Sequence, residues 1–420
     1  MSYYMLNIQA PQISFWGVFL FQKIKIKIMK GWIKSIRQSK GLIFIASTDG
    51  KEDIQLTLKE GEFQLIGEMK VGCSFIAEGV DSITPRGLPE FVVSKIEIVG
   101  SSDDDYPIQP KKHSFDFLRT IPELRGRTKT FQSIWKMRHY LSQEIHRFLS
   151  DKDFFQYWTP IVTQSDCEGA GETFDVKSDW LSEKLTVSGQ LHGEVGMMSM
   201  GQIYTFSPCF RAEKSATKKH LSEFWMLEPE MAFYSLEDTI DLSEELIKTV
   251  LKSVLKYTSD FEKIGIDTKH ITDIVDKEWL KIRYEDICKE FKIEYGHDVS
   301  SDIEKSIIQK YKVPVYITHW PKDLKPFYMK KDEKVAYCFD LIFPEVGELI
   351  GGSEREDSFE ILQSEMIESG LDMDKMQWYL KTRQWGSVPH AGFGMGFDRL
   401  VTFVCKLQKI HDSIPFPIGY

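Results

Sequence analysis

A basic loop stands between two apolar-aromatic runs near the middle of the chain. The runs cover residues 203–210 and 224–233, and the loop contributes cationic side chains at Lys214, Lys218, Lys219 and His220. Arg211 and Glu213 stand where the first run ends. This pattern predicts an antiparallel hairpin with a basic tip. Cationic groups held by two strands suit a polyphosphate ligand, and an exposed hairpin with solvated lysines is the alternative interpretation.

A second stretch, residues 390–400, carries glycines at positions 392, 394 and 396. In a strand, residues spaced by two lie on one face, so that face would be bare and a flat ligand could approach the backbone. Arg399 follows at the start of an apolar helix pattern. Close packing of the strand against a helix is the alternative. The sequence contains neither the Gly-x-Gly-x-x-Gly spacing of dinucleotide-binding folds nor the Walker sequence.

Acidic residues and an arginine surround the pair Gly351-Gly352. Asp340 and Glu348 precede the pair, and Arg355 follows it. Carboxylates without soft ligands nearby suit Mg²⁺ that is held mainly through the phosphates of a nucleotide. A solvated acidic side chain is the alternative for each carboxylate taken alone.

The elements that would carry these groups begin with a small barrel. Short strand patterns occur at 23–31, 41–47, 53–58, 73–80 and 91–99. Five such strands predict a small closed or partly closed β-barrel. Phe44 and Gln55 fall on neighbouring predicted strands, with Arg37 in the connection before Phe44. An aromatic ring, an amide and a guanidinium are the groups that bind single-stranded nucleic acid, whereas core packing or solvated surface is the alternative for each alone.

The predicted domain organisation places this barrel, an OB-fold, at residues 23–100. Residues 1–22 precede it as an N-terminal extension, for which we expect poor order. Residues 101–127 form a polar, proline-interrupted linker or hinge.

The second predicted domain runs from residue 128 to residue 420. It opens with a helical pattern at 128–149, whose apolar stripe could meet a copy of itself in a homodimer. A strand pattern follows at 155–162, and helical patterns around 235–312 predict an insertion of packing helices. Later strand patterns show no βαβ alternation, which predicts an antiparallel β-sheet flanked by helices. The predicted fold class is therefore α+β.

Composition restricts the class of protein further. Hydrophobic content of 42% and charged content of 28% describe an ordinary globular protein, although no acidic residue precedes Asp49. The six cysteines are scattered without a Cys-x-x-Cys pair, which predicts neither zinc nor disulfides and favours a reducing compartment. The longest early apolar run, residues 15–21, is too short to span a membrane. We therefore expect a cytoplasmic protein.

Six stretches together resemble the class II aminoacyl-tRNA synthetases, and within them the asparaginyl branch of the aspartate/asparagine/lysine subgroup. They are FRAE (210–213), HLSEFWMLEPE (220–230), TVSGQL (186–191), GELIGGSERE (347–356), GFGMGFDRL (392–400) and IPFP (414–417). The resemblance covers about residues 23–420, because the barrel, the linker and the C-terminal portion match in order.

The resemblance implies an ATP site on the predicted hairpin. Arg211 looks like the arginine that binds the α-phosphate and the amino-acid carboxylate. Phe224 and Arg399 would enclose the adenine, and Glu213 would contact its amino group. His220 would lie near the γ-phosphate. Arg211 and Arg399 are therefore the expected catalytic residues.

The resemblance also implies an amino-acid site. Glu168 resembles the loop acid that closes over the substrate ammonium group, and Ser188 and Gln190 would support the amino acid. Arg355 would contact the carbonyl oxygen of the substrate side chain. Glu228 falls where the discriminating acid of the family stands.

Metal and anticodon residues follow from the same resemblance. Asp340 and Glu348 resemble the Mg²⁺ carboxylates. Arg37, Phe44 and Gln55 align with the barrel positions that bind the anticodon.

Selectivity for asparagine can be argued from charge. Aspartyl members of the subgroup have a lysine that neutralises the substrate carboxylate, and here Gly193 stands at that position. A carboxylate at Glu228 accepts a hydrogen bond from a carboxamide but repels a second carboxylate. The sequence departs from the family pattern at His192, at Asp398 and in the stretch 197–200.

The implied activity is the ATP-dependent ligation of L-asparagine to tRNA(Asn) through asparaginyl-adenylate, with release of AMP and diphosphate. An aspartyl or non-discriminating aspartyl/asparaginyl enzyme is the main alternative. An amide-forming ligase on a similar catalytic domain should lack the barrel. A non-catalytic RNA-binding paralogue should lack the ATP arginines, yet Arg211 and Arg399 are both present.

Overall fold

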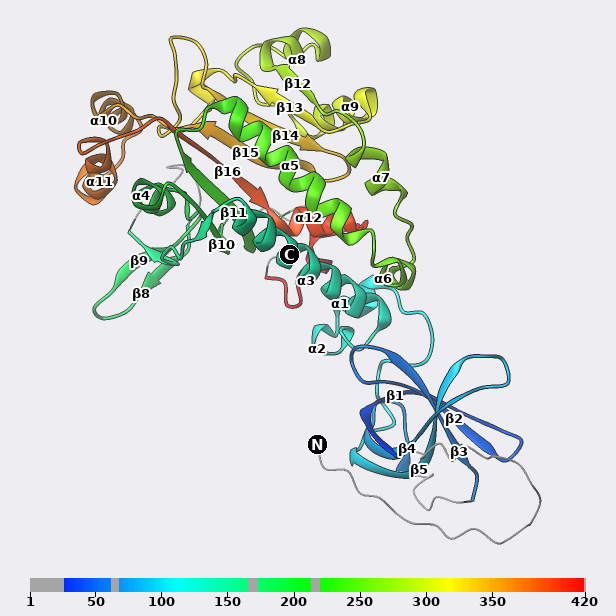
Figure 1. Ribbon diagram of the computed structural model, residues 1–420. Coiled ribbons are helices and arrows are strands. Elements are labelled where there is room, and N and C mark those ends of the chain that lie inside the picture. The colour runs from blue at the N-terminus through cyan, green and yellow to red at the C-terminus, as the bar shows by residue number, and fades with distance from the viewer. Residues whose placement is uncertain (1–25, 62–67, 165–172, 213–219, 419–420) are drawn as a thin grey trace, which may run out of the picture. The chain divides into compact units, whose positions relative to one another are not determined.

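The computed structural model describes residues 26–61, 68–164, 173–212 and 220–418 (Figure 1). The chain forms two units, Met1–His113 and Ser114–Tyr420. The division between them falls inside the stretch expected to be a linker. The expected N-terminal extension, residues 1–22, lies outside the described residues.

The first unit is a closed barrel with the strand order β1-β2-β3-β5-β4. Its strands are β1 (Lys27–Ser39), β2 (Leu42–Thr48), β3 (Asp53–Lys59), β4 (Ser74–Ile83) and β5 (Pro89–Gly100). Neighbours pair antiparallel except β3 and β5, which are parallel. Ile43 and Ile45 of β2 and Leu56 of β3 are fully buried, because alternate residues of a strand point into a barrel. The predicted five-stranded barrel is confirmed within the described residues.

The second unit is built on a sheet that has eight strands within the described residues, in the order β12-β13-β14-β15-β16-β11-β10-β6. In chain order the strands are β6 (Phe155–Gln156), β10 (Gln202–Phe210), β11 (Glu223–Ala232), β12 (Leu280–Arg283), β13 (Val315–Thr318), β14 (Cys338–Phe343), β15 (Gly347–Glu354) and β16 (His390–Gly396). All neighbours are antiparallel except the pairs β12–β13 and β6–β10. A small sheet contains β7 (Val162–Thr163), β8 (Asp175–Lys177) and β9 (Ser182–Leu185).

Helices surround this sheet. They are α1 (Phe115–Arg119), α2 (Pro122–Arg125), α3 (Lys129–Asp151), α4 (Gln190–Met200), α5 (Leu236–Val254), α6 (Thr258–Ile264), α7 (Lys269–Val275), α8 (Tyr284–Phe291), α9 (Ser301–Tyr311), α10 (Phe359–Glu368), α11 (Met373–Leu380) and α12 (Phe397–Val404). Short 3₁₀ turns cover Lys322–Leu324 (η2), Lys381–Arg383 (η3) and Ile410–Asp412 (η4). No helix in the described part of the chain is long and apolar enough to cross a bilayer.

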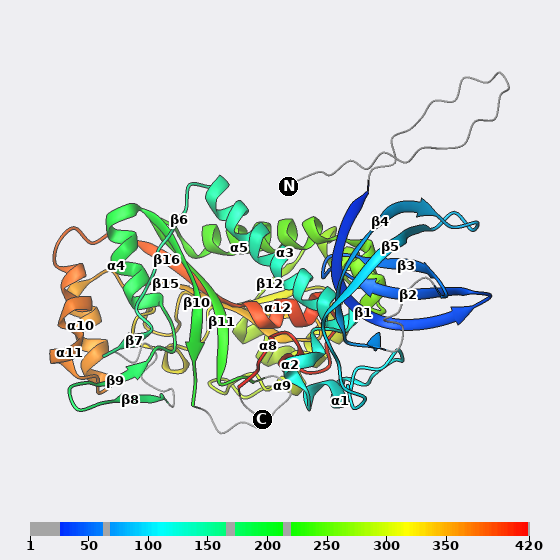
Figure 2. The ribbon, with the colours of Figure 1, turned by 90° about the horizontal axis from the view of Figure 1, so that it is seen from below.

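One face of the sheet packs against α5, which Figures 1 and 2 show lying along the strands beside α3. The hydroxyl of Tyr316 on β13 lies 2.8 Å from Ser243 Oγ of α5. Tyr316 pairs with Leu341 of β14, so Leu341 points to the same side. Because successive residues of a strand alternate between faces, Asp340 points to the opposite face. Asp340 therefore lies on the face of the sheet that α5 leaves uncovered.

The structure changes two expectations about this unit. The predicted strand at 155–162 is two short strands, β6 and β7, separated by a segment that contains Pro160. The region expected as a helical insertion also contains β12, which joins the sheet in parallel to β13 through α8 and α9. A βαβ-type crossover is therefore present, although none was predicted. Four residues are too short a strand to be distinguished from the helical patterns around it.

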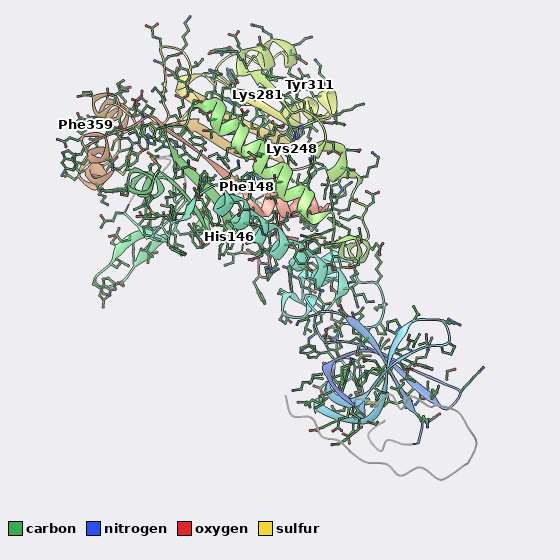
Figure 3. All side chains as sticks on the ribbon, in the orientation of Figure 1. His146, Phe148, Lys248, Lys281, Tyr311 and Phe359 are labelled. Carbon is green, nitrogen blue, oxygen red and sulfur yellow. The ribbon has the colours of Figure 1, made fainter. Side chains whose placement is uncertain are left out.

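Lysine contacts tie this added strand to the helix layer. Lys281 of β12 donates hydrogen bonds to Glu237 and Asp241 of α5, at 2.8 and 2.9 Å. Lys248 of α5 donates to the carbonyl oxygen of Lys277, just before β12, at 2.7 Å. Figure 3 labels both lysines, together with His146 and Phe148 on α3. The region is thus part of the packed sheet rather than an appendage.

Candidate functional site

The predicted hairpin is present as β10 and β11, which pair from Gln202–Met231 to Phe210–Glu223. Arg211 follows directly after β10, and its backbone N–H donates to the carbonyl oxygen of Ser222 at 3.0 Å. The Arg211 guanidinium lies 5.4 Å from the ring centroid of Phe224. The strands therefore place these two side chains against each other. Glu213 in the tip, residues 213–219, lies outside the described residues.

A cavity of about 490 Å³ opens on the face of the sheet that carries Asp340. Its lining brings together seven of the residues expected in a site: Ser188, Gln190, Arg211, Glu228, Asp340, Glu348 and Arg355. Among the described residues, His220, Phe224 and Arg399 are not part of that lining. Glu168 lies outside the described residues.

The three expected ATP residues outside the lining occupy other positions. Phe224 is half-buried beside Arg211, and His220 is exposed where the described chain resumes after the hairpin tip. Arg399 of α12 donates to the backbone carbonyl of Glu348. Since Glu348 lines the cavity, this contact places Arg399 close to the cavity, although Arg399 itself is not part of the lining.

The carboxylates expected to bind a metal stand over one glycine. An ideal Cβ added to Gly351 would lie 3.3 Å from Glu348 Oε1 and 3.5 Å from Asp340 Oδ1. Two carboxylates around one point form an all-oxygen donor pair that fits Mg²⁺. The described residues contain no group of three or more His, Cys, Asp or Glu arranged to hold a metal. An ion here would therefore need further ligands from a phosphate-bearing substrate.

Lys325, which the sequence analysis missed, contacts this pair. Its ammonium lies 2.7 Å from Asp340 Oδ2 and 4.2 Å from the ring centroid of Trp320. Burial raises the pKa of Asp340 to about 6, with Lys325 acting to lower it and Glu348 to raise it. Burial acts to lower the pKa of Lys325, but the acidic groups around it, led by Asp340, outweigh burial and raise it. The charge of Asp340 is therefore already partly balanced by this chain.

Glu228 is anchored at the beginning of α4. Its carboxylate accepts hydrogen bonds from Ser188 Oγ and, at 2.9 Å, from the backbone N–H of Gly189. The side chain is only 2% exposed. A Cβ at Gly189 would lie 2.6 Å from Thr159 Oγ1 and 2.9 Å from Thr205 Cγ2. Only glycine lets the backbone approach the carboxylate this closely.

Arg355 is held by a bidentate ion pair. Its Nη2 donates to Glu230 Oε1 at 2.6 Å and its Nε to Glu230 Oε2 at 3.2 Å. Its Nη1 donates to Ser353 Oγ at 2.7 Å. Burial raises the pKa of Glu230 to about 8, while Arg355 acts to lower it and Glu194 acts to raise it. Two parallel hydrogen bonds fix the plane of the guanidinium, so Arg355 enters the cavity in one orientation.

Two of the departures from the family pattern have clear structural roles. The Asp398 carboxylate is buried and accepts hydrogen bonds from Arg138 of α3 and from the backbone N–H of Trp225, the latter at 2.8 Å. It therefore ties α12 to α3 and β11. His192 stacks on Trp378 with ring centroids 4.5 Å apart, and burial lowers its pKa.

The glycine strand β16 does not present one bare face throughout. A Cβ at Gly392 would lie 2.3 Å from the Glu230 carboxylate, so the neighbouring strand fills that space. Gly394 does line the cavity. Gly392 is thus needed for close packing against the neighbouring strand. Gly394 lies in the cavity wall, where a ligand could approach the backbone.

The barrel residues expected to bind the anticodon lie together on its outer surface. Arg37 and Phe44 are cross-strand partners on β1 and β2, with the guanidinium 5.2 Å from the ring centroid. Gln55 pairs with Ala46, two residues beyond Phe44. Arg37 is thus inside β1. The sequence analysis had placed it in the connection before Phe44, and that expectation was wrong. The three side chains form one outward-facing group, because residues two apart share a face.

The sequence analysis also missed other polar residues around the cavity. Glu230 and His390 were inside quoted motifs but received no role, and Glu194 was not singled out. Glu194 stands four residues after Gln190, which places both on one face of α4. That spacing was the available signal.

Comparison with known proteins agrees with this geometry. A family model described as "tRNA synthetases class II (D, K and N)" matches residues 118–419. A second model, "OB-fold nucleic acid binding domain", matches residues 27–99. The chain belongs to the class II tRNA synthetases of the aspartate, lysine and asparagine group.

Its relatives in that family point to one member. Asparagine–tRNA ligase of Bacteroides fragilis is 38% identical over 93% of each chain. Asparagine–tRNA ligase of Azobacteroides pseudotrichonymphae is 40% identical over 93% of this chain and 94% of its own. The asparaginyl-tRNA synthetase of Pyrococcus horikoshii, solved with asparaginyl-adenylate, superposes with a TM-score of 0.89 at 29% identity and covers 94% of this chain and 95% of its own.

We predict that Gly392→Ala destabilises the second unit by about 2 kcal/mol, because the new methyl overpacks the Glu230–Arg355 pair. The free energy of unfolding from denaturant titration measures the effect. Gly394→Ala is the matched control in the same strand, because the atom closest to its Cβ would be the end of the flexible Met226 side chain, at 2.7 Å. Equal destabilisation by the two substitutions would contradict the prediction.

Proposed function

We propose that this chain catalyses the ATP-dependent ligation of L-asparagine to tRNA(Asn) through an asparaginyl-adenylate, releasing AMP and diphosphate. The observation that carries this proposal is that one guanidinium, Arg355, and one carboxylate, Glu228, both line a single cavity. These are the two groups that a carboxamide needs. The relatives named asparagine–tRNA ligase support the same activity over an aspartyl or non-discriminating enzyme.

Selectivity follows from the charges of the two groups. The Arg355 guanidinium can donate to the carbonyl oxygen of the asparagine side chain, and Glu228 can accept from its NH₂ group. The second oxygen of an aspartate carboxylate has no proton to donate and would face the carboxylate of Glu228. Unpaired or like-charged groups in a buried site discriminate strongly. Gly193 supplies no cation that would reverse the preference.

In the first step the carboxylate of asparagine attacks the α-phosphorus of ATP, and the bond to pyrophosphate breaks. Arg211, in the cavity wall, is suited to bind the α-phosphate and the attacking carboxylate together. We assign Phe224 and Arg399 to the adenine ring, Glu213 to its amino group and His220 to the γ-phosphate. Positioning and charge neutralisation supply most of the catalysis in such a reaction.

Mg²⁺ belongs to this proposal through Asp340 and Glu348, whose oxygens flank Gly351. When bound with ATP, the ion would neutralise phosphate charge. Lys325 already contributes a positive charge at Asp340. The side chains of the chain itself therefore provide part of the electrostatic environment for pyrophosphate departure.

In the second step the terminal ribose hydroxyl of the tRNA, the 3′-OH in this class, attacks the carbonyl carbon of the adenylate, and AMP leaves. Glu168, Ser188 and Gln190 are assigned to hold the amino acid through both steps. Arg37, Phe44 and Gln55 are assigned to the anticodon, since an aromatic ring, an amide and a guanidinium lie on one surface of the barrel. A cytoplasmic homodimer without zinc and without membrane attachment completes the proposal.

Pyrophosphate exchange with asparagine and aspartate in parallel tests the proposed function. We expect exchange with asparagine and at least 100-fold lower efficiency with aspartate, as about 3 kcal/mol of discrimination corresponds to that ratio. Preference for aspartate, or equal use of the two, would overturn the asparagine assignment and leave the aspartyl or non-discriminating alternative.

Glu228→Gln should reduce the preference for asparagine over aspartate by about tenfold or more, because a neutral amide no longer repels the substrate carboxylate. The ratio of kcat/KM values in pyrophosphate exchange measures it. Asp260→Asn is a matched control: this buried acid on α6 accepts a hydrogen bond from Ser133 at 2.9 Å and does not line the cavity. An unchanged ratio in Glu228→Gln would contradict the assigned role.

Phe44→Ala should weaken tRNA use while leaving pyrophosphate exchange nearly normal. Loss of one stacked base costs about 1–3 kcal/mol, which is about a fivefold to 150-fold rise in the KM for tRNA. Aminoacylation and exchange assays on the same preparation separate the two effects. Ile83→Ala, which alters an exposed apolar residue of β4, serves as the control. Equal loss in both assays would mean that Phe44 only supports the barrel.

A further inference from the structure

A buried carboxylate that does not line the cavity, Glu194 of α4, is bonded to the residues around the cavity. Its Oε1 accepts a hydrogen bond from Gln190 Nε2 at 3.0 Å. Its Oε2 accepts from the Tyr379 hydroxyl at 2.7 Å and from Arg383 Nη2 at 2.5 Å. The Glu194 side chain has no solvent exposure. This carboxylate therefore joins α4 to α11 and η3 within the protein interior.

His390 at the start of β16 completes the arrangement. Its Nδ1 lies 2.8 Å from the carbonyl oxygen of Val388, and a carbonyl only accepts, so Nδ1 carries a proton. Its Nε2 lies 3.2 Å from both Arg383 Nη2 and Glu194 Oε2. The Nε2 atom therefore lies beside both the guanidinium and the carboxylate. The imidazole thus joins β16 to the contact between Glu194 and Arg383.

The contact with Glu194 determines how the Gln190 amide is oriented. A carboxylate accepts hydrogen bonds and cannot donate them, so only the NH₂ end of Gln190 can face Glu194. The carbonyl oxygen Oε1 is then the end that remains for the cavity, which Gln190 lines. A carbonyl oxygen accepts from the ammonium group of an amino acid, whereas a flipped amide would present hydrogen-bond donors to it.

The charge of Glu194 also matters for the balance around the cavity. The buried guanidinium groups of Arg355 and Arg383 stand among the acidic side chains of Glu194, Glu228 and Glu230, and burial raises the pKa of Glu230 to about 8. Loss of the Glu194 charge would therefore leave the two guanidinium groups less well compensated. In a medium of low dielectric constant, that change would favour a second carboxylate and disfavour an ammonium group.

Glu194 also lies near the other guanidinium of the cavity. Its Oε1 is 3.9 Å from Arg355 Nε, in addition to the bidentate contact that Arg355 makes with Glu230. Burial acts to raise the pKa of Glu194, but Arg383, His390 and Arg355 outweigh burial and hold it well below its usual value. The carboxylate is therefore present as the anion.

We propose that Glu194 is a positioning residue that turns the carbonyl of Gln190 toward the substrate ammonium group and adds to the selection against acidic amino acids. This inference rests on the proposed function for the identity of the substrate. The coupling between Glu194 and Gln190 does not depend on which amino acid is used.

Glu194→Gln removes the charge and keeps the shape, and the new amide can donate to Gln190 as well as accept from it. We expect a rise of at least tenfold in the KM for asparagine in pyrophosphate exchange, a KM for ATP within twofold of wild type, and a lower asparagine-to-aspartate ratio. The control Asp260→Asn makes the same change in a buried acid outside the cavity lining and should leave all three values within twofold.

A double-mutant cycle with Gln190→Ala separates positioning from general stability. If Glu194 acts through Gln190, the double variant should have an asparagine KM within twofold of Gln190→Ala alone. If the increases in asparagine KM of the two single variants add in the double variant, the proposal is overturned. It is also overturned if Glu194→Gln lowers the melting temperature but keeps the wild-type KM for asparagine.

Tyr379→Phe provides a milder test if Glu194→Gln does not fold. It removes one donor to Glu194 and keeps the charge, so the asparagine KM should rise about twofold to fivefold while the ATP KM stays constant. Equal changes in both values, or no change, would contradict the proposal. If the wild-type enzyme prefers another amino acid, the proposed function fails, and the same cycle run with that amino acid still decides whether Glu194 acts through Gln190.

Discussion

The ion pair between Glu230 and Arg355 is the interaction on which the cavity depends. It joins β11 to the chain that leaves β15, and the two parallel hydrogen bonds fix the orientation of the guanidinium. The pair fits only because Gly392 on the intervening strand carries no side chain. Desolvated ion pairs add little net stability, so the geometry that the pair imposes is its main contribution to the protein.

The remaining polar groups extend from that pair in two directions. Toward α4, Glu194 and Glu228 hold the residues that would contact the amino acid, and both carboxylates are satisfied by donors within the protein. Toward β14, Lys325 balances Asp340 beside Glu348. The amino-acid end of the cavity therefore combines hydrogen-bonded acidic groups with the Arg355 guanidinium, while its other end combines a cation with carboxylates suited to a phosphate-bound metal. This division matches a substrate that carries an ammonium group at one end and a nucleotide at the other.

Much of the site was predictable from the sequence because the motifs are local. The hairpin and the barrel follow from short stretches with regular alternation. Among the seven lining residues, Arg211, Asp340, Glu348 and Arg355 stood out by type and spacing, whereas the family resemblance alone implied Ser188, Gln190 and Glu228. The strand β12 was missed because four residues within helical patterns carry too little periodicity. Arg37 was placed in a connection because its strand continues to Ser39, beyond the end of the clear Lys–Ile alternation. The functional roles expected for the site residues stay predictions, and Glu168, Glu213 and residues 1–22 lie outside the described residues.

The sequence by itself determined the family, the order of the domains and the residue types that could bind a nucleotide and an amino acid. The family follows from the resemblance of short motifs, and the domain order and the residue types follow from composition and from spacing within short segments. Only the tertiary structure decided which charges meet: Glu194 with Arg383, Glu230 with Arg355, and Asp340 with Lys325. Partners that are 15 to 189 positions apart in the chain cannot be matched from periodicity. Their meeting depends on strand register, and on the glycine that leaves room for the Glu230 carboxylate beside β16.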